Sequence, residues 1–184
     1  MKQKIAILTD SSSSIYTLEN QYFNVFVIVI PCFLGDKEFK DFPTKGDMPF
    51  YKALASFKGV PKTSQPSVGE TVAMYEKIRD LGYTDILYLP ISRELSGTYQ
   101  NALVGKDMVE GINIVLVDTL TTVSILSGMV LEAAKLSKEG ASIEEILNRI
   151  EDLKSRWAYY LTVNDLTGLI KNGRLSNAKK FVAD

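Results

Sequence analysis

The sequence predicts an α/β fold in which helices flank a largely parallel sheet. Short aliphatic runs alternate with segments of helical periodicity along most of the 184 residues, and the loops between them are short. The 46% hydrophobic and 23% charged fractions suit a folded domain with a sizeable core and exclude a disordered or collagen-like chain. The length fits one compact domain, or one domain with the beginning of another.

The first half of the chain is expected to open with a buried strand over Lys4–Thr9. A long strand over Asn24–Leu34 should follow, and Gly35-Asp36 should turn the chain toward Glu38–Phe42 to form a hairpin. Pro31 favours an edge position or a bulge in it. Two helices are expected next, over Asp47–Phe57 and Ser67–Leu81. The second has a strong start signal, because Ser67-Val68-Gly69-Glu70 has the spacing of a capping box.

The second half continues the alternation of strands and helices. Serines are expected to cap two of these helices, at Ser96 and Ser142. The predicted elements are the strands Asp85–Pro90 and Asn113–Val117, the helices Ser96–Val109, Thr122–Leu136 and Ser142–Leu153, and a candidate strand Ala158–Val163. In such sheets ligands bind beyond the carboxyl ends of the strands, where loops meet helix N-termini.

Composition excludes several classes of function. There is no histidine, so a Ser-His-Asp triad cannot form and the commonest zinc ligand is missing. Twenty-one Lys and Arg against 22 Asp and Glu give a net charge of −1, which argues against nucleic acid as the main partner. No apolar run reaches the roughly 20 residues that span a bilayer, so stable membrane insertion is not expected.

Cys32 is the only cysteine, which excludes an internal disulfide and a multi-cysteine metal site. A small apolar residue within a strand is favoured over a reactive thiol. The sequence Met1-Lys2-Gln3-Lys4 leads directly into the first strand without the pattern of a signal peptide. The expected location is therefore the cytoplasm, and neither a metal nor a cofactor is expected.

Hydroxyl-rich loops surround the predicted ligand edge of the sheet. Thr63 and Ser64 lie just before the helix that begins at Ser67, so anion binding and an ordinary capped loop are both open for this segment. After the strand that ends at Pro90, Ser96-Gly97-Thr98 repeats the arrangement, and Gly97 would allow a ligand close to the backbone. Two such loops would suit a carboxylate or a phosphate without a fixed positive charge.

The loop after the first strand combines Asp10 with four serines, among them Ser11 and Ser12. Asp10 is expected to accept hydrogen bonds from neighbouring hydroxyls and amides and so to fix the loop, because its own charge would repel an anion. The serines either form a turn or contact the ligand, and Asp118-Thr119 leaves the same two alternatives. No phosphate loop, dinucleotide fingerprint or nucleophile elbow is present, so the residues favour binding over catalysis.

Four blocks occur in the order and spacing of the DegV family, which the chain resembles: Thr9-Asp10-Ser11-Ser12, Lys62-Thr63-Ser64-Gln65-Pro66-Ser67, Leu95-Ser96-Gly97-Thr98-Tyr99-Gln100 and Leu169-Ile170-Lys171-Asn172-Gly173-Arg174-Leu175. These are bacterial fatty-acid-binding proteins, including the binding subunits of fatty acid kinase. The resemblance implies a long-chain fatty acid as ligand and a separate kinase subunit as partner, with no enzymatic activity in this chain. It further implies that Thr63, Ser64, Ser96 and Gly97 hold the carboxylate, with support from Asp10, Ser11, Ser12, Ser67 and Thr98.

The same resemblance links Arg174 to the phosphorylated head group or to the partner, with a surface arginine as the alternative. Family members usually continue into a longer second lobe, so residues 1–155 would form the first lobe and 156–184 an incomplete start of the second. The short length fits a fragment, a broken reading frame or a short homologue. The glycines expected near Ser124 are displaced, which leaves a role for that residue open. Two other functions are considered: an enzyme acting on a small anionic substrate at these loops, and a remnant that no longer binds lipid.

Overall fold

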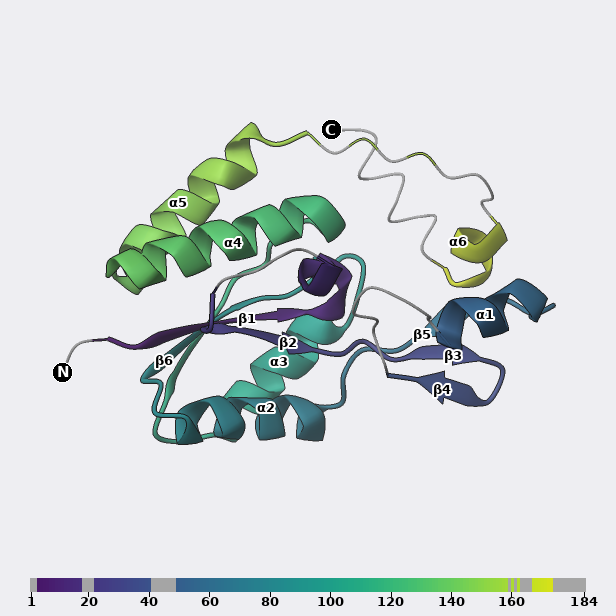
Figure 1. Cartoon of the computed structure of the whole chain (residues 1–184), viewed down its shortest axis with the longest axis horizontal. Coiled ribbons are helices and arrows are strands. Elements are labelled where there is room, and N and C mark those ends of the chain that lie inside the picture. Colours follow the sequence, from purple (N-terminus) through teal and green to yellow (C-terminus); the bar gives the residue numbers. More distant parts are fainter. Residues whose placement is uncertain are drawn as a thin grey trace.

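The computed structural model describes residues 3–17, 22–40, 49–158, 160, 162 and 167–173. Within these residues a parallel sheet lies between two layers of helices, with a smaller sheet beside it (Figure 1). The predicted α/β fold with a largely parallel sheet is confirmed. The strands of the main sheet are, in spatial order, β2 (Val25–Ile28), β1 (Ile5–Asp10), β6 (Asp85–Leu89) and β7 (Asn113–Leu116).

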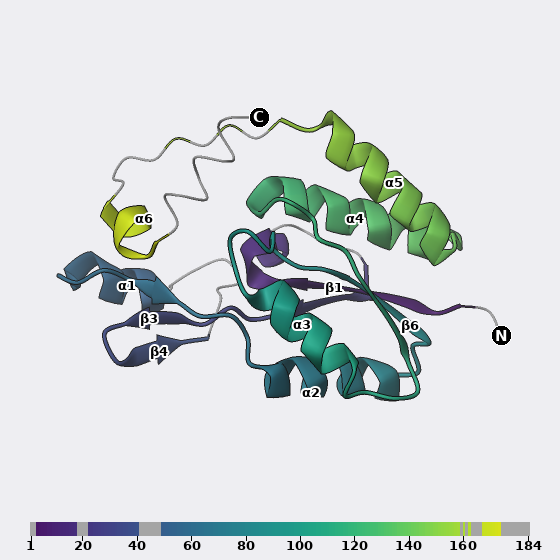
Figure 2. The ribbon, with the colours of Figure 1, turned by 180° about the vertical axis from the view of Figure 1, so that it is seen from behind.

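Helices cover both faces of the main sheet (Figures 1 and 2). Helices α4 (Val123–Glu139) and α5 (Ile143–Arg156) lie on one face, and α2 (Val68–Asp80) and α3 (Thr98–Lys106) lie on the other. Side chains of β1 alternate between the two layers: Ile5 and Ile7 join the core under α4, while Ala6 and Leu8 join the core under α2 and α3. Burial on both faces explains why this strand reads as a continuous aliphatic run.

Close packing fixes α3 against α2 and brings their N-termini to the same edge of the sheet. Gly105 leaves room for this contact, because a Cβ atom there would lie 3.4 Å from Thr71 and 3.5 Å from Tyr75. The Tyr75 hydroxyl donates to the carbonyl of Ala102 at 3.1 Å. The last turn of α3 therefore lies against the first turn of α2, and the start of α3 lies beside the loop that precedes α2.

The smaller sheet is antiparallel and contains β4 (Lys37–Phe39), β3 (Cys32–Leu34) and β5 (Lys62–Thr63), in that order. Helix α1 (Pro49–Ser56) lies against it, with the rings of Phe39 and Phe50 5.4 Å apart. The hairpin expected at Gly35 is confirmed, since Leu34 pairs with Lys37 and Gly35 has a φ of 62°. Figure 1 places this sheet beyond the carboxyl ends of the main strands.

The single strand predicted over Asn24–Leu34 is wrong. The chain forms β2 in the main sheet, leaves it, and starts β3 in the smaller sheet. Pro31 lies between the two strands, where the missing N–H group of proline costs no ladder hydrogen bond. The short strand β5 was not expected at all, because Lys62 and Thr63 pair only with distant β3.

The N-terminal caps were predicted correctly for two helices and wrongly for one. Ser67 and Ser142 each form a capping box, with Glu70 and Glu145 respectively. Ser96, by contrast, is not the N-cap of α3: that position is Gly97, and no side chain caps the helix. The reason is a turn in which the N–H groups of Leu95 and Ser96 both bond to the carbonyl of Ser92, which delays the start of the helix.

Some predictions fall wholly or partly outside the described residues. These are Asp47, at the start of the helix expected over Asp47–Phe57, and half of the candidate strand over Ala158–Val163. Residues 158, 160 and 162 of that segment are described and belong to no strand. The helix expected after Asp47 is confirmed as α1. Helix α5 ends at Arg156, next to the expected boundary after residue 155, but the division into 1–155 and 156–184 stays a prediction. A short helix, α6 (Thr167–Lys171), follows.

Candidate functional site

Asp10 connects the loops that follow β1 and β6. Its Oδ1 accepts the Ser12 N–H at 2.9 Å and the Ser12 hydroxyl at 2.5 Å, and its Oδ2 accepts the Ile91 N–H at 2.7 Å. Burial raises the pKa of this carboxyl group, while the hydrogen bonds from Ser12 and Ile91 oppose the increase. Asp10 thus fixes the geometry of two loops, as the sequence predicted for it.

The serines after Asp10 form a turn held by their own hydrogen bonds. Ser11 is buried, and its hydroxyl accepts the N–H of Ile30 at 2.9 Å, which ties the loop to the end of β2. The Ser13 hydroxyl donates to the Asp10 carbonyl at 2.8 Å. Together with the Ser12 contacts to Asp10, these bonds favour the turn interpretation of the serine run over direct contact with a ligand.

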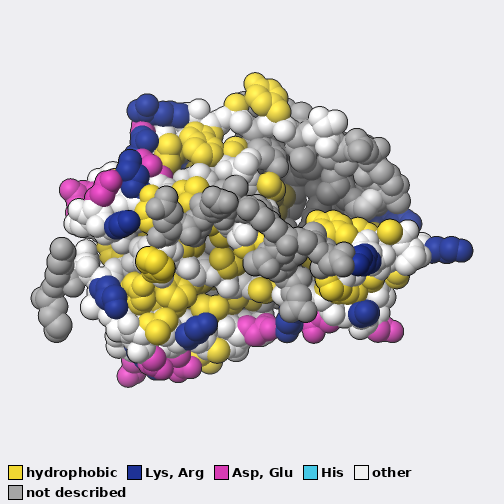
Figure 3. Space-filling model, viewed as in Figure 1, with side chains coloured by type: hydrophobic (Ala, Val, Ile, Leu, Met, Phe, Trp, Pro, Cys, Tyr) yellow, Lys and Arg dark blue, Asp and Glu magenta, His cyan; other side chains and the backbone are white. Residues whose placement is uncertain are grey.

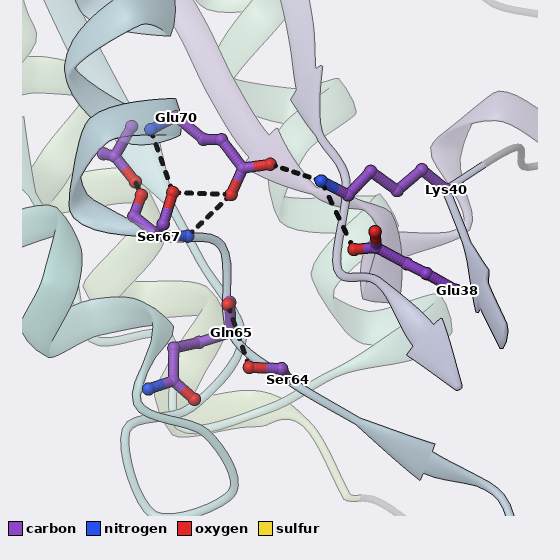
Figure 4. A network of polar contacts seen from close by, with 7 residues as sticks. Glu38, Lys40, Ser64, Gln65, Ser67 and Glu70 are labelled. Carbon is purple, nitrogen blue, oxygen red and sulfur yellow. Dashed lines mark hydrogen bonds and ion pairs between the residues drawn. The ribbon is translucent and has the colours of Figure 1, made fainter. Parts of the chain in front are cut away.

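The free N–H groups and the partial positive charge at the N-terminus of α2 are already satisfied by side chains of the protein. The Ser67 N–H and hydroxyl donate to Oε2 of Glu70 at 2.8 and 2.7 Å (Figure 4). Glu70 Oε1 accepts a hydrogen bond from Lys40 at 2.8 Å, and Lys40 also pairs with Glu38 at 3.3 Å. Lys40 and Ser67 lower the pKa of Glu70 to about 2. Ser67 is therefore a helix cap, and the carboxylate beside it disfavours an anion at this helix.

The N-terminus of α3 differs from that of α2. Its first turn contains no acidic residue, and Gly97 supplies no side-chain cap. The Ser96 hydroxyl accepts the Thr98 N–H at 3.3 Å and lies 2.9 Å from the Thr98 hydroxyl. Ser96 is half-buried and Thr98 is buried. This helix end therefore combines two hydroxyls with a positive partial charge that no side chain of its first turn neutralises.

Two contacts join the loop before α2 to the start of α3. The Asn101 side chain donates to the carbonyl of Pro66 at 2.9 Å. The Gln65 side chain lies against Gly97, since a Cβ atom on Gly97 would be 3.1 Å from Gln65 Cδ. The expectation that these hydroxyl-bearing loops converge is met. The motif order alone did not reveal Gln65 and Asn101 as the connecting residues.

Thr63 and Ser64 are exposed next to this junction. Thr63 is the last residue of β5 and pairs with Cys32 of β3, while the Ser64 N–H donates to the Pro31 carbonyl at 3.2 Å. The Ser64 hydroxyl has only a long contact, 3.3 Å, to the carbonyl of Gln65. Cys32 is a half-buried strand residue, as expected, and burial raises the pKa of its thiol.

The loop after β7 supports the site from the other side. The buried Thr119 hydroxyl donates to the Pro90 carbonyl at 2.7 Å, and the Ser92 N–H donates to the carbonyl of Thr121 at 2.9 Å. Asp118 Oδ1 accepts the Arg93 N–H at 3.2 Å, and its Oδ2 pairs with Arg93 Nε at 3.0 Å. These bonds give Asp118 and Thr119 structural roles.

The chain continues from this loop into α4 through strained backbone. Leu120 and Val123 have φ values of 55° and 51°, a region that favours glycine. Ser124, the next residue, is exposed, and the structure gives it no contact that indicates a role.

The late sequence block lies beside the same region. The Asn172 side chain donates to the carbonyl of Pro61 at 3.4 Å, one residue before β5 begins. Gly173 follows with a φ of 69°, where glycine is favoured. Arg174 comes directly afterwards but lies outside the described residues.

The described residues lack two features that would indicate other types of site. Among the described residues, no group of three His, Cys, Asp or Glu side chains is placed to hold a metal ion. No helix in the described part of the chain is long and apolar enough to cross a membrane. On the face seen in Figure 3, Lys and Arg side chains are interspersed with Asp and Glu.

Comparisons with known proteins place this chain in a family. The profile of the DegV family, described as uncharacterised proteins, matches residues 4–184. A DegV domain-containing protein of Staphylococcus aureus is 33% identical over 97% of this chain, and one of Halalkalibacterium halodurans is also 33% identical over 97%. The chain spans 62% and 63% of the length of these two relatives.

Solved structures agree with these matches. A fatty acid-binding DegV protein of Bacillus subtilis superposes on 99% of this chain and 64% of its own, with a TM-score of 0.82 and 27% identity. A Thermotoga maritima protein described as having a fatty acid binding function superposes on 82% of this chain and 55% of its own, with a TM-score of 0.71 and 30% identity. The chain belongs to the DegV family.

Proposed function

We propose that this chain binds a long-chain fatty acid and holds its carboxylate between the loop at Thr63 and Ser64 and the start of α3 at Ser96 and Gly97. The observation that carries the proposal is the contrast between the two adjacent helix N-termini. Ser67 and Glu70 occupy that of α2, whereas the first turn of α3 offers hydroxyls and amides without an acidic residue. The structures named above are described as binding fatty acids, which supports the same ligand here.

Neutral donors suit this task. Burying an acyl chain contributes roughly 0.8 kcal/mol per CH₂ group, so the head-group site need only orient the carboxylate and satisfy its oxygens. Two cations near these loops, Lys40 and Arg93, are each paired with carboxylates of the protein. Leu120, in the loop after β7, and Val123, the first residue of α4, are 49% and 42% exposed, and both are available to contact an acyl chain.

The proposal also assigns binding and phosphorylation of the fatty acid to different proteins. The chain would present the bound fatty acid to a separate kinase subunit, with Arg174 near the phosphorylated head group or the partner. The link between Asn172 and Pro61 supports a position of the late block close to the head-group loop. Supporting roles fall to Asp10, Ser11, Ser12 and Thr98, which hold the loops through the bonds described above, and Ser67 acts as the cap of α2.

The test is fatty acid binding by the purified 184-residue chain. Organic extraction followed by mass spectrometry detects co-purified lipid, and calorimetry with added hexadecanoic acid measures affinity. The double variant Thr63→Ala with Ser96→Ala should weaken binding at least tenfold, because two donors to a charged group are lost. Ser56→Ala is the control, since the Ser56 hydroxyl is exposed and bonds only within α1.

The outcomes separate the alternatives. If the chain neither carries nor binds fatty acid, the lipid-binding proposal fails for it and the remnant interpretation is supported. If it binds but the double variant binds equally well, the carboxylate lies elsewhere.

A further inference from the structure

Gln65 occupies the junction of the two head-group loops. It directly follows Ser64, and its side-chain amide lies on Gly97, the N-cap of α3. A Cβ atom on Gly97 would lie 3.1 Å from Cδ, 3.2 Å from Nε2 and 3.5 Å from Oε1 of Gln65. Figure 4 shows the Gln65 side chain extending away from the network of Ser67, Glu70 and Lys40. The amide is thus directed toward α3 and away from the compensated end of α2.

The side-chain amide of Gln65 has no hydrogen-bond partner in the part of the chain that the structure describes. Its backbone carbonyl accepts a hydrogen bond from the Ser64 hydroxyl at 3.3 Å. Its neighbours differ: Ser67 bonds to Glu70, and Asn101 bonds to Pro66. A primary amide carries two N–H donors, which remain available to a ligand at this exposed position.

The backbone of Gly97 does not require glycine. Its φ of −71° and ψ of 3° are accessible to every residue with a side chain. Two physical reasons for a glycine remain: the approach of a ligand to the backbone, and space, because a Cβ atom at this position would press on the Gln65 amide. Because Gly97 has no side chain, the Gln65 side chain has room to lie at the start of α3.

From these contacts we infer that Gln65 is a further contact residue of the carboxylate site, which donates an amide N–H to the ligand and makes the site select an acid over a neutral head group. This inference rests on the proposed function. A neutral amide can stabilise a carboxylate without a fixed charge, in keeping with the hydroxyls of Thr63, Ser64 and Ser96 around it. Gly97 contributes to this arrangement because it has no side chain and so leaves room for the Gln65 amide.

The test compares two probes of equal chain length, hexadecanoic acid and 1-hexadecanol. Gln65→Ala should weaken binding of the acid roughly tenfold or more, as expected for the loss of one hydrogen bond to a charged group. The affinity for the alcohol should change by less than about twofold. Gln65→Glu should weaken the acid further, because two carboxylates would face each other. Gln3→Ala is the matched control, since Gln3 is exposed just before the amino end of β1.

A second measurement tests the contact with Gly97. Gly97→Ala should weaken binding of the acid in the wild-type background and have little further effect when Gln65 is already alanine. Thermal unfolding checks that each variant is folded.

Each outcome is informative. A wild type that binds the acid, with unchanged affinity in Gln65→Ala, overturns the role of Gln65 and leaves the proposed function intact. Equal weakening of acid and alcohol also overturns it, because selection of the head group is then absent. An equal cost of Gly97→Ala in both backgrounds overturns the role given to Gly97. A wild type that binds neither probe overturns both the inference and the proposed function.

Discussion

Individual polar residues at the carboxyl edge of the main sheet divide into two groups. Asp10, Ser11 and Ser67 have their polar atoms engaged by the protein, which makes them parts of the scaffold. Thr63, Ser64 and Gln65 are exposed and have few contacts of their own. A group can contact a ligand only where the fold leaves its donors free, so the second group carries the proposed binding chemistry.

Asp10 provides a prediction at the scale of the residue. Asp10→Asn should lower the free energy of unfolding by about 1–3 kcal/mol, because an amide cannot accept on both sides from Ser12 and Ile91. Chemical denaturation measures the change. Asp36→Asn, in the exposed turn between β3 and β4, is the control and should be nearly neutral.

The pH dependence of the same variant has a definite sign. Burial raises the pKa of Asp10 above 3.8 in the folded protein, so the folded state retains a proton that the unfolded state has lost. The part of the Asp10 contribution that depends on pH is largest below pH 3.8 and declines as the pH rises from 3.8 through the raised pKa. Above that pKa both states are ionised, and the part that comes from the hydrogen bonds of Ser12 and Ile91 to the carboxylate remains. The difference between wild type and Asp10→Asn should therefore shrink as the pH rises above 3.8. A difference that grows with pH contradicts this account.

Among the elements, α2 and the small sheet depend on one another through Glu70. This side chain completes the capping box of α2 and also receives Lys40, which follows β4. The same box in α5, formed by Ser142 and Glu145, has no lysine partner among the described residues. Comparing the two helices therefore separates the effect of the capping box from the effect of the ion pair between Glu70 and Lys40.

Glu70→Gln should reduce the loss of stability in acid. The pKa of Glu70 is lowered from 4.5 to about 2, so its contribution is present above pH 4.5 and is lost as the pH falls through the lowered pKa. Because the side chain is 43% exposed, solvent screens the ion pair, and we expect a contribution of only about 1 kcal/mol at neutral pH. Glu145→Gln should reduce the loss of stability in acid by a smaller amount. Urea unfolding between pH 2 and 7 measures the free energy of unfolding of both variants. An equal effect of the two variants would show that Lys40 adds nothing.

Sequence patterns predicted these elements well wherever the signal is local. Capping boxes at Ser67 and Ser142 require only residues three positions apart, and the strand before Asp10 is buried on both faces because Ile5, Ala6, Ile7 and Leu8 are all apolar. Pattern failed where distant partners decide, because strand β5 exists only through the pairing of Lys62 and Thr63 with β3. It also failed at the start of α3, where a local turn at Ser92 delays the helix and leaves Gly97 as the cap.

At the scale of the whole molecule, Trp157 joins the end of α5 to α4. Trp157 is the sole tryptophan, and its ring lies on Gly128 in the middle of α4. A Cβ atom on Gly128 would approach the ring to 2.3 Å, so the glycine allows the end of α5 to lie against α4. Glycine there costs helix propensity but permits this contact.

Gly128→Ala should therefore displace the ring of Trp157. We expect a red shift of tryptophan emission and a loss of stability, although alanine normally favours a helix by up to about 1 kcal/mol relative to glycine. Fluorescence and thermal unfolding measure the two effects. Gly69→Ala is the control, because a Cβ atom at that helical glycine meets nothing within 4 Å, and it should leave the emission unchanged. A stabilised Gly128→Ala protein with unchanged emission would contradict the contact.

The sequence by itself determined the α/β class, the alternation of strands and helices, two helix caps and the edge of the sheet at which polar loops collect. These features follow from periodicity, composition and contacts between near neighbours in the chain. Tertiary structure alone decided which hydroxyls remain free, which helix N-terminus is compensated, and that Gln65 lies on Gly97. Those properties depend on contacts such as Lys40 with Glu70 and Asn101 with Pro66, which join residues about 30 or more positions apart and leave no local pattern.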